Sequence, residues 1–212
     1  MNTTTFVARR HTRLARDVLS LFKLRIGMLI MVTALVGLAI TPGPALSAGQ
    51  VLVLALSVLV ASASAGAFNQ YVEHEDDRLM ARTRGRAFVT GALPHHPAWL
   101  ALMAALLAGA VGAAWFALNG AAALYVFLGA FFYAVVYTVW LKRRSAWNIV
   151  IGGLAGSFAV LAGGAAADPS LGPLPLLLAR NPNRATAMGS FFASLVQLSA
   201  LLVAATLDGL MR

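Results

Sequence analysis

Three oxygen-bearing side chains recur at every fourth position of one stretch of the chain: Asn69, Glu73 and Asp77. In an α-helix, four residues turn the chain only about 40° beyond one full turn, so the three lie along one face at roughly 6 Å intervals. Oxygen ligands on one face suit Mg²⁺, which proteins hold through one or two carboxylates together with substrate phosphates. The spacing therefore predicts a metal-binding face.

Arginines continue the same stretch at similar spacing. Arg82 and Arg86 follow the acids, and an arginine can hold phosphate oxygens through two hydrogen bonds at once. Acids and arginines together at the edge of an apolar segment indicate a metal–diphosphate site. A second interpretation stays open on spacing alone: a solvated loop in which Glu73 or Asp77 pairs with Arg78 or Arg82.

A second basic cluster, Lys142–Arg144, lies far along the chain. One interpretation is an anchor that fixes the orientation of the preceding apolar segment in the membrane. The other is further phosphate binding on the same face as Arg82 and Arg86. The two roles are compatible.

The composition places these groups in a membrane protein. Of the 212 residues, 60% are hydrophobic and only 11% are charged, against about 25% charged residues in soluble domains. A soluble globule of this composition would expose large apolar patches and aggregate. The absence of cysteine excludes disulfides, thiolate nucleophiles and cysteine-ligated metals.

The net charge of +9 is concentrated in short basic clusters between apolar runs. That distribution is the positive-inside signal of membrane proteins rather than a nucleic-acid-binding surface. The leading stretch is compatible with a mitochondrial transit peptide as well as with a cytoplasmic tail. We expect a multi-pass protein of the bacterial cytoplasmic (inner) membrane rather than of the mitochondrial inner membrane.

The expected fold is all-α, a polytopic bundle of about six spans, since each span needs about 20 apolar residues. Residues 1–25 are expected to form a basic cytoplasmic tail and residues 26–212 a single membrane-embedded domain. The expected spans are Ile26–Ile40, Val51–Phe68, Ala98–Leu118, Ala121–Leu141, Asn148–Ala167 and Ala187–Leu207.

The regular alternation of sides breaks after the fifth expected span. The segment Leu171–Ala179 contains two prolines and is too short to cross the hydrocarbon as a helix, yet the basic residues Arg180 and Arg184 follow it. Either Arg180 and Arg184 lie on the outer side, against the positive-inside rule, or a longer part of the fold is missing here. A third interpretation is that this short broken segment is re-entrant or interfacial.

The stretch from Asn69 to Arg86 resembles the first aspartate-rich motif of the UbiA-type intramembrane prenyltransferases, N-x-x-x-D-x-x-x-D followed by M-x-R-T-x-x-R-P. Leu21–Ile26 is similar to the KPRI opening of that family. Within the family, Lys142–Gly153 is similar to the haem O synthase (protoheme IX farnesyltransferase) pattern. Arg180–Arg184 and the last span resemble the last cytoplasmic loop and helix of the same enzymes.

The resemblance implies transfer of a farnesyl group from farnesyl diphosphate to a vinyl group of protohaem (heme b) within the lipid bilayer. It implies Mg²⁺ as the cofactor, held by Asn69, Glu73 and Asp77, which would also be the catalytic residues. The diphosphate would be neutralised by four basic residues: Arg82, Arg86, Lys142 and Arg143.

The sequence departs from the family pattern at several places. Glu73 stands for an Asp, Leu24 and Ala87 stand for prolines, and Phe158–Val160 stands for Phe-Pro-Pro. After Asp77 the only acids are two isolated aspartates, Asp168 and Asp208, so the second acidic motif of these enzymes is absent. We therefore predict a relative that lacks two to three internal helices between about residues 167 and 176.

Four functions follow as alternatives. The chain is an active farnesyltransferase, working with one acidic face or with a second protomer of a homo-oligomer that supplies the rest. Alternatively, it is a shortened, inactive member that binds prenyl diphosphate or haem, or only assembles with partners. Two weaker alternatives are a UbiA-type enzyme with an aromatic acceptor and a small transporter. Carriers, however, place their acids at mid-depth of the membrane rather than at its edge.

Overall fold

The computed structural model describes residues 16–142, 144 and 148–170, and every regular element in this part of the chain is helical. Among these residues, three helical stretches are long and apolar enough to cross a membrane. They are α3 (Ala48–Val72), α6 (Ala98–Ala117) and the continuous stretch Gly120–Leu141. Two shorter apolar helices join them, α2 (Leu24–Ile40) and the later part of α8 (Asn148–Ala167). The all-α prediction is confirmed here.

The five expected spans that fall in the described residues match observed helices closely. The fourth differs in kind, because the α-helix α7 (Gly120–Phe131) passes into a π-helix, η1 (Phe132–Leu141). A π-helix of this length is unusual, since most are single-turn bulges, and such bulges are frequent at functional sites. The sixth expected span and the residues from 171 to 184 lie outside the described residues.

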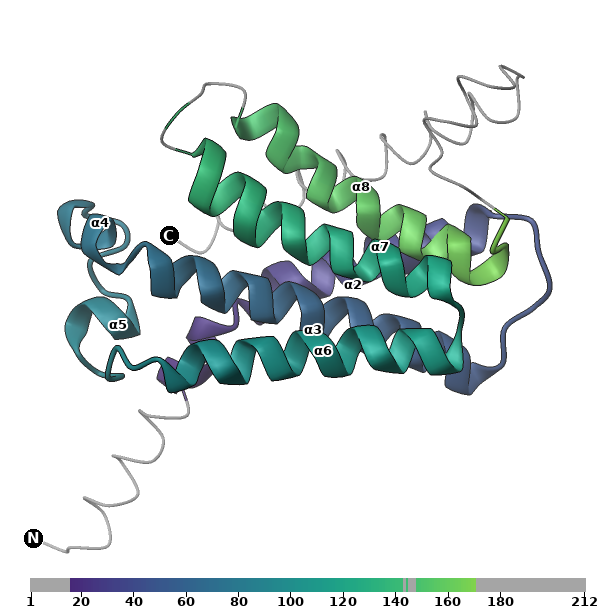
Figure 1. Cartoon of the computed structure of the whole chain (residues 1–212), viewed down its shortest axis with the longest axis horizontal. Coiled ribbons are helices and arrows are strands. Elements are labelled where there is room, and N and C mark those ends of the chain that lie inside the picture. Colours follow the sequence, from purple (N-terminus) through teal and green to yellow (C-terminus); the bar gives the residue numbers. More distant parts are fainter. Residues whose placement is uncertain (1–15, 143, 145–147, 171–212) are drawn as a thin grey trace, which may run out of the picture.

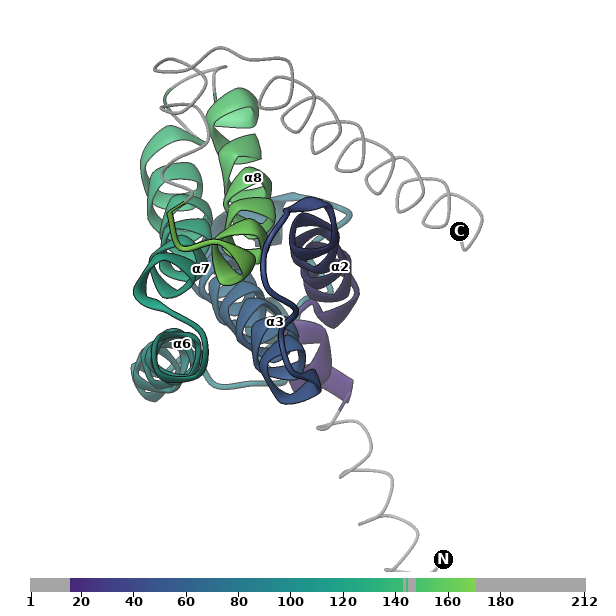
Figure 2. The same cartoon turned by 90° about the vertical axis from the view of Figure 1, so that its right-hand side faces the viewer.

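Helix α3 lies at the centre of the bundle, in contact with α2, α6 and α7, while α8 packs against α2 and α7 (Figures 1 and 2). Two short helices, α4 (His74–Leu79) and α5 (Ala87–Thr90), lie together at one end, on the left in Figure 1. We call this the charged end. The opposite end carries the α2–α3 and α6–α7 connections, and we call it the turn end.

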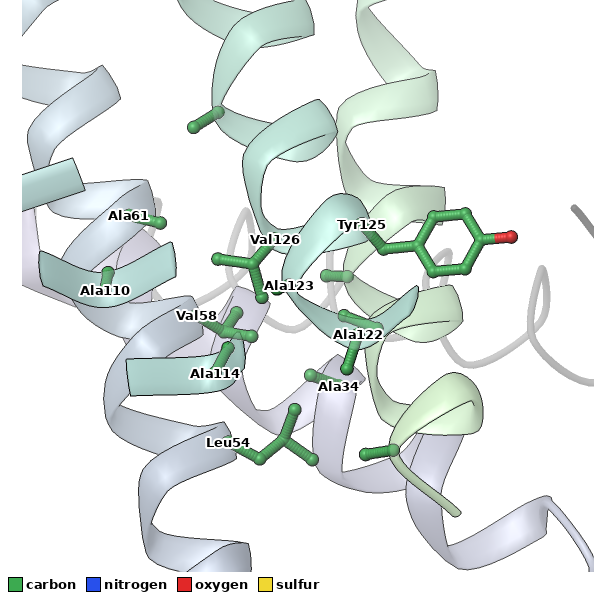
Figure 3. Close-up of a cluster of buried hydrophobic side chains, with 14 of the residues drawn as sticks. Ala34, Leu54, Val58, Ala61, Ala110, Ala114, Ala122, Ala123, Tyr125 and Val126 are labelled. Carbon is green, nitrogen blue, oxygen red and sulfur yellow. The ribbon is translucent and has the colours of Figure 1, made fainter. Parts of the chain in front are cut away.

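The core between the helices is built mainly of small side chains. Figure 3 shows alanines from α2, α3, α6 and α7 around Leu54 and Val58. Glycines allow the closest approach: a Cβ at Gly37 would collide with the carbonyl of Val160, and one at Gly163 with that of Ala34. Small residues at such crossings are the usual means of close packing between membrane helices.

Uncharged side chains cap two helices, α3 and α7, at the turn end. Ser47 and Gln50 form a capping box at the start of α3. Asn119 caps α7 by accepting from the N–H of Ala122 at 2.9 Å, and its amide also donates to the Ala165 carbonyl of α8 at 2.8 Å. These hydrogen bonds satisfy backbone groups that helix termini otherwise leave unpaired.

Candidate active site

The three oxygen-bearing residues predicted from spacing do share one side of the chain. Helix α3 ends at Val72 and α4 starts at His74, with Glu73 as the hinge between them. The N–H of Glu73 donates to the Asn69 carbonyl at 3.1 Å, and the N–H of Asp77 donates to the Glu73 carbonyl at 2.9 Å. The step of four therefore survives the break between helices. All three residues are buried, at 3%, 5% and 3% exposure for Asn69, Glu73 and Asp77.

Each of these three residues contacts a cation from a different segment. The Lys23 ammonium donates to Oδ1 of Asn69 at 2.7 Å, from the start of α2. The Lys142 ammonium, just after η1, lies 2.5 Å from Oε1 of Glu73. We call these two contacts, together with the contact of Arg86 with Asp77 described next, the ladder.

The third contact of the ladder closes the loop between α4 and α5. Arg86 donates to Oδ2 of Asp77 at 2.5 Å. The hydroxyl of Thr83 donates to the backbone carbonyl of Asp77 at 3.2 Å, and Thr83 is itself buried. The loop therefore folds back on the acid that precedes it. A buried carboxylate must be paired in this way, because an unpaired charge in the interior is costly.

The solvated-loop interpretation is wrong for Glu73 and Asp77, because both are buried and pair with Lys142 and Arg86. It does describe Glu75, which pairs with Arg78 at 3.3 Å on the surface. Among the predicted phosphate ligands, the ladder includes Arg86 and Lys142. Arg82 is exposed and pairs with no carboxylate in the described part of the chain. Arg143 lies outside the described residues.

Lys23 was not predicted as a site residue, and the structure gives it three unusual properties. It is the only non-glycine residue in the described part of the chain with positive φ, at 47°. Its stem packs over Gly66, where an added Cβ would meet the Lys23 Cδ at 3.5 Å. Burial, and then the charge of Arg86, lower the pKa of its ammonium from 10.5 to about 8, although Glu73 and Asp77 act in the opposite direction. Lys23 therefore lies within electrostatic reach of the other charged groups of the ladder: Arg86, Glu73, Lys142 and Asp77.

The π-helix supplies a further contact to the ladder. The hydroxyl of Thr138 donates to the carbonyl of Tyr133 at 2.8 Å and accepts from the Asn69 amide at 3.3 Å. Thr138 in η1 and Lys142 just after it are four residues apart, as are their partners, Asn69 in α3 and Glu73 just after it. The two helices therefore run in the same direction and finish together at the charged end.

A stack of rings fixes the loop that carries Arg86. The ring of His95 lies between those of Tyr71 and His74, with centroid distances of 3.9 and 3.8 Å. A ring nitrogen of each histidine lies within hydrogen-bonding distance of the Tyr71 carbonyl, at 3.0 and 3.1 Å. Phe88 of α5 meets Tyr71 edge-on at 5.6 Å. The loop is therefore tied to the end of α3, which holds Arg86 near Asp77.

An apolar cavity of about 70 Å³ begins at Lys23 and extends between α2, α3, α7 and α8. Its walls include Ile26, Val126 and Ala159, and Tyr133 joins Lys23 among the few polar groups in the lining. The ammonium of Lys23 therefore belongs both to the ladder and to the lining of an apolar space. A ligand with a charged head and an apolar tail suits this junction.

The donor set fits Mg²⁺ only when phosphate completes it. No group of three His, Cys, Asp or Glu side chains gathers as a metal cage within the residues that the structure describes. The ladder offers two buried carboxylates, Glu73 and Asp77, and the amide oxygen of Asn69. That is the set Mg²⁺ uses when substrate phosphates supply its other ligands.

Lys23 and Thr138 are the contributors that reasoning from the sequence missed. Lys23 lies in the opening motif, Leu21–Ile26, but nothing in its spacing relates it to a residue 46 positions later. Thr138 sits in an apolar run that is typical of a membrane span. Only the packing of three helices brings these residues to Asn69.

Comparison with known proteins gives a consistent family. The model of the UbiA prenyltransferase family matches residues 30–204. The chain is 55% identical over 160 residues to "Protoheme IX farnesyltransferase 2" of Paramagnetospirillum magneticum, covering 76% of this chain and 56% of that protein. It is 42% identical to "Protoheme IX farnesyltransferase 1" of the same organism, covering 77% and 57%.

A third relative, "Protoheme IX farnesyltransferase" of Gluconacetobacter diazotrophicus, is 40% identical over 167 residues, covering 77% of this chain and 51% of that protein. The chain thus spans about half the length of the curated relatives it matches. No solved structure matches it.

Proposed function

The chain belongs to the UbiA prenyltransferase family, and on that premise we propose that it is a protoheme IX farnesyltransferase (haem O synthase). The reaction transfers a farnesyl group from farnesyl diphosphate to the vinyl group of protohaem. The observation that carries the proposal is the junction at Lys23, where a buried ladder of acids and cations meets an apolar cavity. A prenyl diphosphate has the same division into a charged head and an apolar tail.

The residues of the ladder have distinct proposed roles. Asn69, Glu73 and Asp77 would hold Mg²⁺, which when bound supplies Lewis-acid neutralisation of the diphosphate charge. Arg86 and Lys142 would bind the diphosphate oxygens, with Arg82 and Arg143 as further cations of the same loops. Lys23 joins this set as a cation that the sequence did not single out.

Departure of the diphosphate is the step that these cations assist. The bond between C1 of the farnesyl chain and the diphosphate oxygen breaks, and its electron pair leaves with the oxygen. Negative charge then grows on the phosphate side, where Arg86 and Lys142 are already held in place by their carboxylate partners. Fixed cations stabilise developing charge without the reorganisation that water would need. The apolar lining around Tyr133 limits access of water to the allylic cation that is left.

The proposed setting is a bacterial cytoplasmic membrane. We propose a multi-pass bundle of about six spans over residues 26–212, with residues 1–25 as a tail and the charged end facing the cytoplasm. The positive-inside rule supports this orientation, since the basic cluster 78–86 and the residues Lys142 and Arg144 lie at that end. Reporter fusions after residues 168 and 212 test the topology and the expected gap between residues 167 and 176. A regular six-span topology with Arg180 outside would weaken the prediction of an internal deletion.

The test is haem O formation in membranes that express the chain, supplied with farnesyl diphosphate, protohaem and Mg²⁺. Haem O formed by the parent chain and lost in Asp77→Asn supports the proposal. It would also mean that one acidic face suffices, or that protomers of a homo-oligomer complement each other. Absence of haem O from folded, inserted protein contradicts the proposed activity.

One observation favours a second candidate function. The only acids that follow Asp77 in the sequence are Asp168 and Asp208, so the second acidic motif implied by the resemblance does not occur in it. The second candidate is therefore a catalytically inactive family member that binds prenyl diphosphate or haem, or only assembles with other proteins. Binding of farnesyl diphosphate without haem O formation would identify it.

A further inference from the structure

We propose that Thr138 is a positioning residue that keeps the side-chain amide of Asn69 with its oxygen, rather than its NH₂ group, turned toward the charged cluster. The inference deepens the proposed function, on which it rests, because it concerns how one metal-binding oxygen is presented. It rests on a series of hydrogen bonds that connects the start of α2 with α3 and η1. The series runs from Lys23 through Asn69 and Thr138 to the Tyr133 carbonyl.

Donor and acceptor are fixed for every hydrogen bond in this series, because the group at one end can only donate and the group at the other end can only accept. The Lys23 ammonium has donors only, so it faces the amide oxygen of Asn69, at 2.7 Å. The carbonyl of Tyr133 has acceptors only, so the Thr138 hydroxyl donates its one proton there, at 2.8 Å. The same hydroxyl is left to accept from the Asn69 NH₂ group, at 3.3 Å. The hydroxyl and the ammonium therefore select the same one of the two orientations of the amide.

Burial makes this selection consequential. Asn69 and Thr138 are 3% and 4% exposed, so water has little access with which to satisfy a reversed amide. Reversal would aim the NH₂ group at the ammonium of Lys23, donor against donor. It would also present hydrogen atoms instead of an oxygen to a hard cation, which binds oxygen ligands.

The π-helix places the hydroxyl. In an α-helix, a threonine hydroxyl bonds back to the carbonyl three or four residues earlier. In η1 the hydroxyl of Thr138 reaches the carbonyl five residues earlier. The widened turn thus sets both the proton direction of the hydroxyl and its place beside Asn69.

The experiment compares Thr138→Val, which keeps the shape but removes the hydroxyl, with Thr138→Ser, which keeps the hydroxyl. Mn²⁺, as a spectroscopic probe of the Mg²⁺ site, is titrated into the detergent-solubilised full chain in the presence of inorganic diphosphate. Partners that orient a metal ligand typically contribute about 10–100-fold in metal affinity. We expect a loss of about that size in Thr138→Val and near-parental affinity in Thr138→Ser.

A second pair of variants separates orientation from general structure. An aspartate at position 69 has two equivalent oxygens and needs no selection. In an Asn69→Asp background, Thr138→Val should therefore leave the Mn²⁺ affinity nearly unchanged. Equal losses in the Asn69 and Asn69→Asp backgrounds would overturn the inference, and so would parental affinity in Thr138→Val.

Folding is checked by thermal unfolding of each variant, and Thr138→Ala replaces Thr138→Val if the valine variant does not fold. The outcomes for the two proposals are distinct. Metal binding with the expected pattern but without haem O formation supports the role of Thr138 and contradicts only the farnesyltransferase activity. A parent chain that binds no Mn²⁺ with diphosphate overturns the role of Thr138 as well.

Discussion

The two ends of the bundle use polar groups in opposite ways. At the turn end, serine, glutamine and asparagine side chains satisfy backbone groups of helix termini and carry no charge. At the charged end, Glu73 and Asp77 are buried and held by cations from separate segments. Burying charge is a poor way to gain stability, because desolvation offsets most of the attraction. The contrast therefore supports the proposal that the charged end, and not the turn end, carries the chemistry.

Arg86→Met should produce the largest effect, and it acts on the charged end alone. The variant removes a proposed diphosphate ligand and leaves Asp77 without its ion-pair partner. Loss of one group that stabilises charge in a transition state costs about 10²–10³ in rate. Haem O formation measures it, with the exposed Arg84→Met as the matched control. A smaller loss in Arg86→Met than in Arg84→Met would contradict the assignment of Arg86.

Gly163→Ala should produce the largest loss of stability, and it tests the core between the two ends of the bundle. The new Cβ would collide with the carbonyl of Ala34, so α2 and α8 must separate. Overpacking of this kind costs about 3 kcal/mol. Thermal unfolding in detergent measures the loss. Gly112→Ala is the control, because a Cβ there meets nothing within 4 Å, and it should leave stability unchanged or slightly raised.

Lys142→Met sharpens the comparison, because it separates the stability and the activity of the charged end. The change removes the ion pair of Lys142 with the buried Glu73 carboxylate and should lower the free energy of unfolding by about 2 kcal/mol. Adding Glu73→Gln should recover much of that stability but no farnesyl transfer. Parallel unfolding and haem O assays measure both quantities. Recovery of activity in the double variant would mean that the pair serves folding only.

Asn119→Ala should have the smallest effect and confine it to the turn end. The variant removes the cap of α7 and the bond to the Ala165 carbonyl. Loss of such a cap costs about 1 kcal/mol. Asn119→Ser keeps a capping oxygen and should retain about half of the lost stability. Haem O formation per folded protein should not change in either variant, and a large change would contradict the division between the two ends.

Much of the fold was predictable, because apolar length alone identifies membrane spans. The expected span Ala98–Leu118 and the observed helix Ala98–Ala117 differ by one residue. The conversion of α7 into η1 was not predictable, because apolar patterns report burial and not the width of a turn. At the site, a spacing of four residues identified Asn69, Glu73 and Asp77, because this spacing places side chains on one face of a helix.

The partners of those residues depend on how separate helices pack. Lys142 and Arg86 were expected on the phosphate side, and the structure brings both to the acids. Arg82 was expected there on the same grounds, yet it is exposed, because the loop turns between residues 80 and 85. The expected metal and diphosphate roles of all these residues stay predictions until binding is measured.

The shared direction of α3 and η1 has an electrostatic consequence. Peptide dipoles in a helix sum to about half a negative charge at its C-terminus. Since both helices finish at the charged end, two such negative poles lie beside the ladder. The backbone therefore adds to the attraction that Glu73 and Asp77 exert on cations. This contribution depends on no side chain, so it would persist in a variant that has lost both carboxylates.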